Sequence, residues 1–83
     1  MENEGCFKNT NFTIVTNRNE FEVRGLRRIW VNRDILSGAY NLFYQDSIYD
    51  YRLIYWSHDR DAIHDDKDRL IRLINEGYKT IRL

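Results

Sequence analysis

The chain has 83 residues, 42% of them hydrophobic and 31% charged, and its 13 basic and 13 acidic side chains give a formal net charge of zero. This composition is typical of one small folded domain and excludes a disordered chain. The charge balance argues against a protein that holds nucleic acid through a general basic excess. No apolar run reaches the roughly 20 residues that a membrane-spanning helix needs.

The N-terminal residues predict a flexible polar arm at 1–10, followed by a single α+β domain at 11–83. The opening MENEGCFKNT is acidic and polar, so we expect neither a signal peptide nor a transit peptide. Cys6 is the single cysteine and cannot form an internal disulfide, which favours a reduced, cytoplasmic setting. No base or orienting group lies near it in the sequence, so it is not expected to act as a nucleophile.

The first part of the domain carries the pattern of a β-hairpin. Residues 12–16 (FTIVT) are β-branched and aromatic, and residues 17–19 (NRN) have turn chemistry. Residues 20–24 (EFEVR) alternate strictly between apolar and charged side chains. The alternation predicts an antiparallel hairpin with Phe21 and Val23 facing inward.

Strand-forming residues continue after the hairpin, with one ambiguous segment. Gly25 interrupts the pattern as a bulge or bend would, and residues 26–31 (LRRIWV) form either an extension of the second strand or a third strand. Asn32 could cap a short helix. Because later residues are richer in strand formers, we expect a short helical turn at 33–38 and a strand at 39–45.

Residues 49–56 (YDYRLIYW) carry the strongest strand pattern in the chain. Alternation places Leu53 and Tyr55 on one face and the even-numbered residues of 52–56 on the other. Since both faces are substantially apolar, this segment is expected to be a central strand.

Residues 60–76 are predicted to form the one long helix. Aspartates crowd its first turns and arginines its last, and Gly77 supplies a stop. Residues 79–83 (KTIRL) then form a short final strand. The predicted buried stripe consists of Ile63, Leu70, Leu73 and Ile74. The predicted fold class is therefore α+β, an antiparallel β-sheet of about four strands with one long C-terminal helix packed on one face.

The segment 57–68 (SHDRDAIHDDKD) combines two histidines with five aspartates. On a helix, Asp61, either His64 or Asp65, and Asp68 would lie on neighbouring turns, an arrangement that can hold a divalent cation. The two histidines lack the four-residue spacing that places both imidazoles on one metal. A solvated helix start is therefore the favoured interpretation, and we predict no metal, no cofactor and no enzymatic activity.

Arginine and aromatic side chains are the second notable feature. Residues 18–33 hold five arginines and two glutamates, and in strand geometry Arg24, Arg28 and Trp30 share a face. Such a face suits a protein interface or a single-stranded nucleic-acid platform, and ordinary cross-strand pairing is a third possibility. The tyrosines offer further recognition area at low entropy cost. They are Tyr40, Tyr44, Tyr49, Tyr51 and Tyr55.

These patterns predict a small non-enzymatic protein that docks an Arg/Tyr/Trp-rich surface onto a larger protein. The alternative is a single-stranded nucleic-acid-binding module that uses the sheet face. By compositional analogy with small proteins of viruses and mobile elements, we expect an inhibitor or accessory factor, with no membrane partner and with homo-oligomers possible. The predicted partner-binding residues are Arg24, Arg28, Trp30, Tyr44, Arg52 and Trp56.

Overall fold

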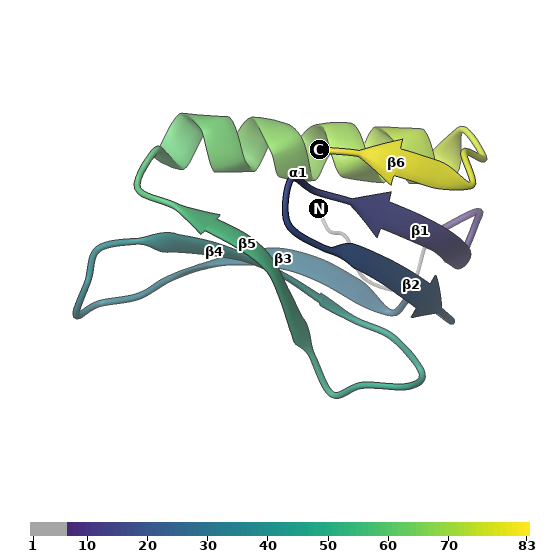
Figure 1. Ribbon diagram of the computed structural model, residues 1–83, viewed down its shortest axis with the longest axis horizontal. Helices are drawn as coiled ribbons and strands as arrows, with labels where there is room; N and C mark the ends of the chain where they lie inside the picture. The colour runs from purple at the N-terminus through teal and green to yellow at the C-terminus, as the bar shows by residue number, and fades with distance from the viewer. Residues whose placement is uncertain (1–6) are drawn as a thin grey trace.

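The computed structural model describes residues 7–83, which form two three-stranded sheets and one helix (Figure 1). In chain order the elements are β1 (Asn11–Val15), β2 (Glu20–Arg24), β3 (Arg28–Arg33), β4 (Tyr40–Gln45), β5 (Arg52–Ser57), α1 (Arg60–Asn75) and β6 (Thr80–Arg82). The first sheet has the strand order β2-β1-β6 and the second β3-β4-β5. The predicted α+β class is confirmed, and the prediction of one sheet of about four strands is wrong.

The chain leaves the first sheet at Gly25, which explains why the strands divide into two sheets. Gly25 has a φ of +74°, a left-handed conformation that favours glycine. Its N–H and that of Leu26 both donate to the carbonyl of Thr10, at 2.9 and 3.0 Å. These bonds turn the chain out of β2 before β3 begins. The bend predicted at Gly25 is confirmed, and the strand after it is a third strand in a different sheet.

The first sheet consists of a hairpin with one added strand. β1 pairs antiparallel with β2, so the predicted hairpin is confirmed, and Phe21 and Val23 are buried as expected. β6 pairs with β1 in parallel, with Ile14 opposite Ile81. A parallel neighbour requires a long connection, and here it consists of four strands and α1. The outer face of this sheet is polar, as a solvated face usually is.

The second sheet has β4 in its centre, so the prediction that residues 49–56 form a central strand is wrong. β5 is an edge strand with a β-bulge, an extra residue that shifts the alternation of its side chains. The ladder pairs on either side of the bulge are Phe43–Leu53 and Leu42–Tyr55, with Ile54 between them. Because of this shift, Arg52 and Trp56 lie on opposite faces, contrary to the simple alternation.

Residues 34–39 connect β3 to β4 in a hairpin. The Gly38 N–H donates to the Asp34 carbonyl at 2.8 Å, which forms one turn of helical type, so the short helical turn predicted at 33–38 is confirmed over 34–38. The Asp34 side chain organises this turn. Its Oδ1 accepts the N–H of Leu36 at 3.1 Å, and its Oδ2 accepts the Ser37 hydroxyl at 2.9 Å. Gly38 closes the turn with a φ of +76°. The strand predicted at 39–45 is confirmed as β4.

The helix agrees with its prediction to within one residue at the C-terminal end. Asp59 caps its start by accepting the N–H of Ala62 at 3.0 Å. At its end, Gly77 has a φ of +91° and donates to the carbonyl of Ile74 at 3.0 Å. The fully buried residues of α1 are Ile63, Leu70 and Ile74.

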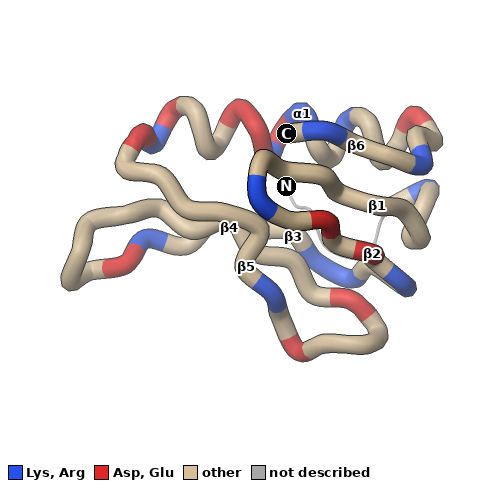
Figure 2. The backbone as a smooth tube through the Cα atoms, in the orientation of Figure 1, with Lys and Arg blue, Asp and Glu red and all other residues tan. Residues whose placement is uncertain are grey.

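The helix lies across the inner faces of both sheets and closes one common core (Figure 1). That core consists of Phe12, Ile14, Phe21, Val23, Leu26, Ile29, Leu42, Tyr44, Ile54, Ile63, Leu70, Ile74 and Ile81. Charged residues occur along α1 and β2, whereas β4 carries none (Figure 2). Of the arm expected at 1–10, residues 1–6, including Cys6, lie outside the described residues. Phe7 packs against the core, and the N–H of Lys8 donates to Asn75 Oδ1 at 3.1 Å.

Candidate functional site

The candidate site is the outer face of the second sheet, the face opposite α1. Ladder partners in an antiparallel sheet point to the same side, so the register assigns each residue to a face. Pairs such as Ile29–Tyr44 are buried against the helix, and the alternate pairs point outward. The outward residues of the three strands are Arg28, Trp30, Asn32, Asn41, Phe43, Gln45, Leu53 and Trp56. We call Trp30, Phe43, Tyr51, Leu53 and Trp56 the aromatic face.

Ring contacts connect Trp30, Phe43 and Tyr51, whereas the Trp56 ring meets His58 edge-on at 5.6 Å. The Trp30 and Phe43 rings stack with centroids 5.5 Å apart, and the Tyr51 ring meets Phe43 edge-on at 5.4 Å. The Arg28 guanidinium lies over the Trp30 ring, 4.3 Å from its centroid. Phe43 therefore occupies the middle of a row that reaches from β3 to the residue before β5.

The margins of this surface are open to solvent, whereas Trp30 and Phe43 in its middle are half-buried. Trp56 is 57% exposed, Tyr51 62% and Leu53 40%. Within residues 7–83, the element that packs on this sheet is α1, and it lies on the inner face. The first sheet differs, because its outer face carries side chains such as Thr13, Glu22 and Arg82. Large apolar side chains on an uncovered sheet face are unusual in a solvated domain and indicate an interaction surface.

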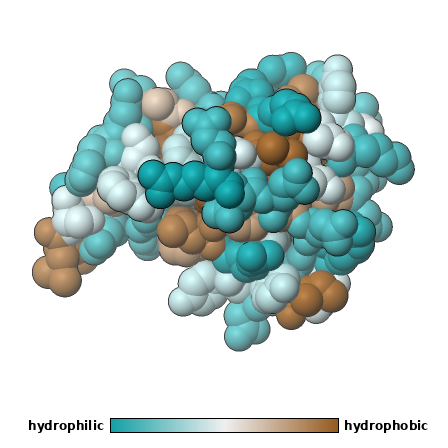
Figure 3. All heavy atoms as spheres, viewed as in Figure 1, coloured by the Kyte–Doolittle hydropathy of each residue, from teal (hydrophilic) through white to brown (hydrophobic). Residues whose placement is uncertain are grey.

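Two hairpin tips extend the apolar surface beyond the sheet. In the β3–β4 turn, Ile35 is 87% exposed and Leu36 97% exposed, and in the β4–β5 loop Ile48 is also exposed. Figure 3 shows hydrophobic tips at the far left and the lower right, where Figure 1 places these two connections. Sequence reasoning missed Ile35 and Leu36 because it did not recognise this turn as a hairpin connection. If Asp34 and Gly38 had been recognised as the two ends of a hairpin connection, the exposure of Ile35 and Leu36 at its tip would have been predicted.

Three of the predicted partner-binding residues come together on this face. Arg28, Trp30 and Trp56 all point outward from the second sheet. Arg24 does not join them, because it lies on β2 in the first sheet, where its Nη2 is 3.6 Å from a carboxylate oxygen of Glu22. The sequence argument carried the alternation of β2 through Gly25 into β3, and the turn at Gly25 breaks that alternation.

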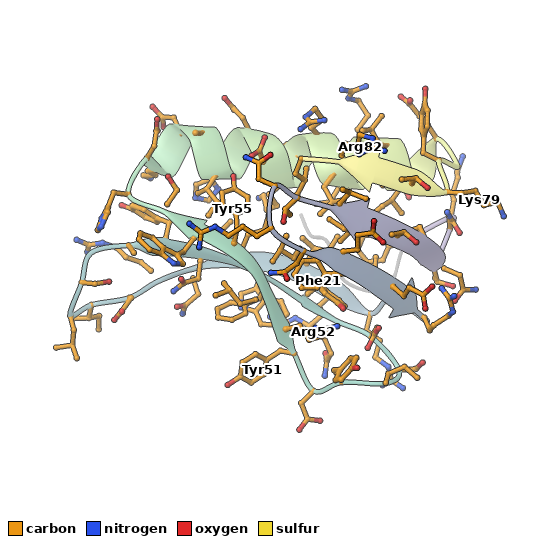
Figure 4. All side chains as sticks on the ribbon, in the orientation of Figure 1. Phe21, Tyr51, Arg52, Tyr55, Lys79 and Arg82 are labelled. Atoms are coloured by element: carbon orange, nitrogen blue, oxygen red, sulfur yellow. The ribbon has the colours of Figure 1, made fainter. Side chains whose placement is uncertain are left out.

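Tyr44 and Arg52 lie on the inner side of the second sheet. Tyr44 is fully buried, so its ring is not accessible to a partner in this fold. Burial raises the pKa of the Tyr44 hydroxyl, and the nearby Arg52 guanidinium partly offsets this rise. The Arg52 guanidinium also lies 5.0 Å from the centroid of the Phe21 ring, which joins β5 to β2 (Figure 4). Both residues therefore hold the two sheets together.

The carboxylates of the segment 57–68 have local structural roles. Asp59 caps α1, and Asp66 accepts a hydrogen bond from the Tyr55 hydroxyl and lies 3.6 Å from Arg69. Burial and the neighbouring Asp66 carboxylate raise the pKa of Tyr55. Among residues 7–83, no group of three His, Cys, Asp or Glu side chains converges as a metal site requires.

Comparison of the chain with models of protein families, with curated proteins and with solved structures finds no match. Within the described part of the chain, no helix has both the length and the apolar character needed to cross a bilayer.

Proposed function

We propose that this chain is a small non-enzymatic binding protein that docks the aromatic face onto a larger protein. The observation that carries the proposal is the contrast between the two sheets. The outer face of the first sheet is polar, whereas the second presents Trp30, Phe43, Tyr51, Leu53 and Trp56, and no element within residues 7–83 forms a layer over them. Burial of such side chains by a partner removes apolar area from water, which is the main favourable term in association.

The charges around the face also favour a protein partner. Arg28 is the one charged side chain among the outward residues of β3, β4 and β5, and its guanidinium already contacts the Trp30 ring. The neighbouring outward residues Asn32, Asn41 and Gln45 are neutral amides. Protein interfaces combine an uncharged aromatic centre with a polar rim that can form hydrogen bonds. Arginine and tryptophan are also the residue types most enriched in binding hot spots.

The hairpin tips supply anchors at the margins of the same surface. Leu36 projects from a turn that Asp34 and Ser37 hold through their side chains, so little conformational freedom remains to be lost on binding. A rigid sheet with protruding aliphatic tips acts on a partner by occupying its surface. An inhibitory or accessory role is part of the same proposal.

A second candidate function is single-stranded nucleic-acid binding, because aromatic rings on an antiparallel sheet form a stacking platform for bases. The single arginine on the outer face makes this candidate weaker, since phosphate neutralisation needs several cations. The Trp30 ring is also already in contact with Phe43 and Arg28.

The salt dependence of binding to random single-stranded DNA and RNA separates the two candidates. We expect weak or undetectable binding by the wild-type chain and by Arg28→Ala. Micromolar binding that falls by several powers of ten between about 50 and 200 mM salt would contradict the protein-partner proposal. If Arg28→Ala lost this nucleic-acid binding and Arg24→Ala retained it, the binding would be assigned to the outer face of the second sheet, because Arg24 lies on the first sheet.

A further inference from the structure

The free edge of β5 opens onto a groove that the aromatic face does not explain. Among the strands of residues 7–83, β5 has one neighbour, β4, and its other side has none. Along β5 lies a groove of about 590 Å³, which residues 53–56 line on one wall and residues 16–19 of the β1–β2 turn line on the other. Asp66 and Leu83 complete the lining. Figure 4 shows Tyr55 in this region, between β5 and α1.

We propose that this groove binds a single extended segment of a partner polypeptide, which pairs with β5 as an added strand. An edge strand presents a row of backbone N–H and C=O groups without a ladder partner, and an extended peptide supplies acceptors and donors at the matching spacing. Because Ile54 bulges out of the ladder, the four lining residues of β5 span three ladder positions, about 10 Å of extended chain at 3.3 Å per residue. The groove therefore suits a short segment of about this length.

The second wall of the groove favours a thin segment over a second copy of this domain. The turn at 16–19 is held by the N–H of Thr16, which donates to the Asn19 carbonyl at 2.9 Å, and by the Thr16 Oγ1, which accepts the N–H of Asn19 at 3.1 Å. Adjacent strands in a sheet lie only about 4.8 Å apart. A whole sheet that approached β5 edge-on would meet the 16–19 turn on the opposite wall, whereas a single strand needs little more than this spacing.

The edges of the first sheet carry charge or contact α1, whereas β5 has a bulge at Ile54 and the 16–19 turn across the groove as its own protection. The carbonyl of Arg82 in β6 accepts a hydrogen bond from Arg69 Nη1 at 3.0 Å, so α1 occupies part of that edge. β2 carries Glu20, Glu22 and Arg24 at alternate positions, and such charges discourage strand addition. The groove-lining residues of β5 carry no charge: they are Leu53, Ile54, Tyr55 and Trp56.

The two sides of the added strand would meet different chemistry. On the outer side, Leu53 and Trp56 offer an apolar contact that continues into the aromatic face. On the inner side, the Asp66 carboxylate accepts the Tyr55 hydroxyl and lies near Arg69, so it presents acceptor atoms with little net charge. Arg18 on the opposite wall adds one positive charge to the lining, which matches the negative charge of Asp66 in formal count. The segment should therefore carry no net charge and alternate apolar side chains with small neutral hydrogen-bonding groups. We assign this segment to a protein partner on the basis of the proposed function.

A displayed library of random 12-residue peptides, selected against the full chain, tests this inference. The selected peptides are then synthesised, and their affinity and the hydrogen exchange of the chain are measured. We expect protection of the backbone amides of residues 53–56 and an apolar–polar alternation in the selected sequences. Asn19→Trp or Asn17→Trp, which add bulk to the opposite wall, should weaken binding at least tenfold. The Asn19 hydrogen bonds within the turn come from its backbone, so that turn should be retained.

The controls separate this inference from the docking of the aromatic face. Tyr51→Ala changes the aromatic face outside the groove lining and should leave peptide affinity unchanged, as should Tyr78→Ala. The inference is overturned if no peptide is selected, if the peptides protect the outer face or hairpin tips instead of β5, or if Asn19→Trp binds them normally. If the chain self-associates and this protects the amides of β5, the edge binds a second copy of the chain, and the inference is equally overturned.

Discussion

Replacing Gly25 by alanine tests the junction that separates the two sheets. Gly25 has a φ of +74°, and a Cβ at this position would lie 2.8 Å from Ser47 Oγ and 3.0 Å from Ser47 Cβ. That hydroxyl donates to the carbonyl of Arg24 at 2.5 Å, and the backbone N–H of Ser47 donates to the same carbonyl at 3.0 Å. The added methyl group therefore forces Ser47 away from the contact that joins the β4–β5 loop to β2.

Two effects add to the expected loss of stability. A non-glycine residue in the left-handed region costs about 1–2 kcal/mol. Loss of the Ser47 hydrogen bond contributes about 0.5–1.5 kcal/mol more. We therefore expect Gly25→Ala to lower the free energy of unfolding by about 2–3 kcal/mol, a large part of the 5–15 kcal/mol typical of a small domain. Each 1 kcal/mol corresponds to a melting temperature about 4–8 °C lower at this chain length.

Gly38→Ala provides the matched control. Gly38 has a φ of +76°, but a Cβ there has no neighbour within 4 Å, so only the conformational penalty applies. Urea unfolding of the two variants beside the wild type should show a loss at Gly25 about 1 kcal/mol larger than at Gly38. Equal losses would refute the assignment of a tight contact to Gly25 and Ser47.

Leu70→Ala should lower the free energy of unfolding by about 2–4 kcal/mol, because Leu70 is fully buried in the core, and a loss below 1 kcal/mol in urea unfolding would contradict that burial. Tyr55→Phe should destabilise by about 1 kcal/mol at neutral pH through loss of the hydrogen bond to Asp66. Since folding raises the pKa of Tyr55, the unfolded chain loses the Tyr55 hydroxyl proton at a lower pH than the folded chain does. The free energy of unfolding should therefore fall as the pH rises above about 10. An equally steep fall in Tyr55→Phe would refute this assignment. Addition of Mg²⁺, Mn²⁺ or Zn²⁺ should leave the melting temperature unchanged, whereas a saturable rise would reveal a site in segment 57–68.

Local patterns in the sequence were sufficient to predict the helix and the first hairpin. The stripe of Ile63, Leu70 and Ile74 has helical spacing, and Asp59 and Gly77 mark the two ends of the helix through short-range hydrogen bonds. In the hairpin, alternation in residues 20–24 assigns each side chain to a face. All these signals depend on residues that are close in the chain, so they can be recognised in the sequence without knowledge of the tertiary structure.

Long-range pairing was not predictable in the same way. The parallel pairing of β1 with β6 joins segments that α1 and four strands separate in the chain, and no local pattern specifies it. The bulge at Ile54 moves one residue out of the ladder and reverses the faces expected for the strand residues after it. Apolar residues on both faces of β5 suggested a central strand, but one of these faces is exposed.

The candidate site was predictable only in part, for the same physical reasons. Trp30 and Arg28 are two positions apart on one strand, and simple alternation brings them together. Phe43 joins them only through the ladder between β3 and β4, which the sequence analysis did not pair. Tyr44 was counted as a surface residue because composition suggested too many rings for the core, yet the core encloses it.

Affinity capture from cells after nuclease treatment, compared among matched variants, tests the docking of the aromatic face most directly. Tyr51→Ala and Trp56→Ala remove exposed rings from this face, and Tyr78→Ala removes a ring of similar exposure, 52%, beyond α1. We predict that a protein partner is retained after nuclease treatment and binds Tyr78→Ala as it binds the wild type. Loss of a hot-spot ring costs about 2 kcal/mol, so each of the other variants should bind it roughly 30-fold more weakly. Equal affinity for all three variants, or loss of the captured partner on nuclease treatment, would contradict the account.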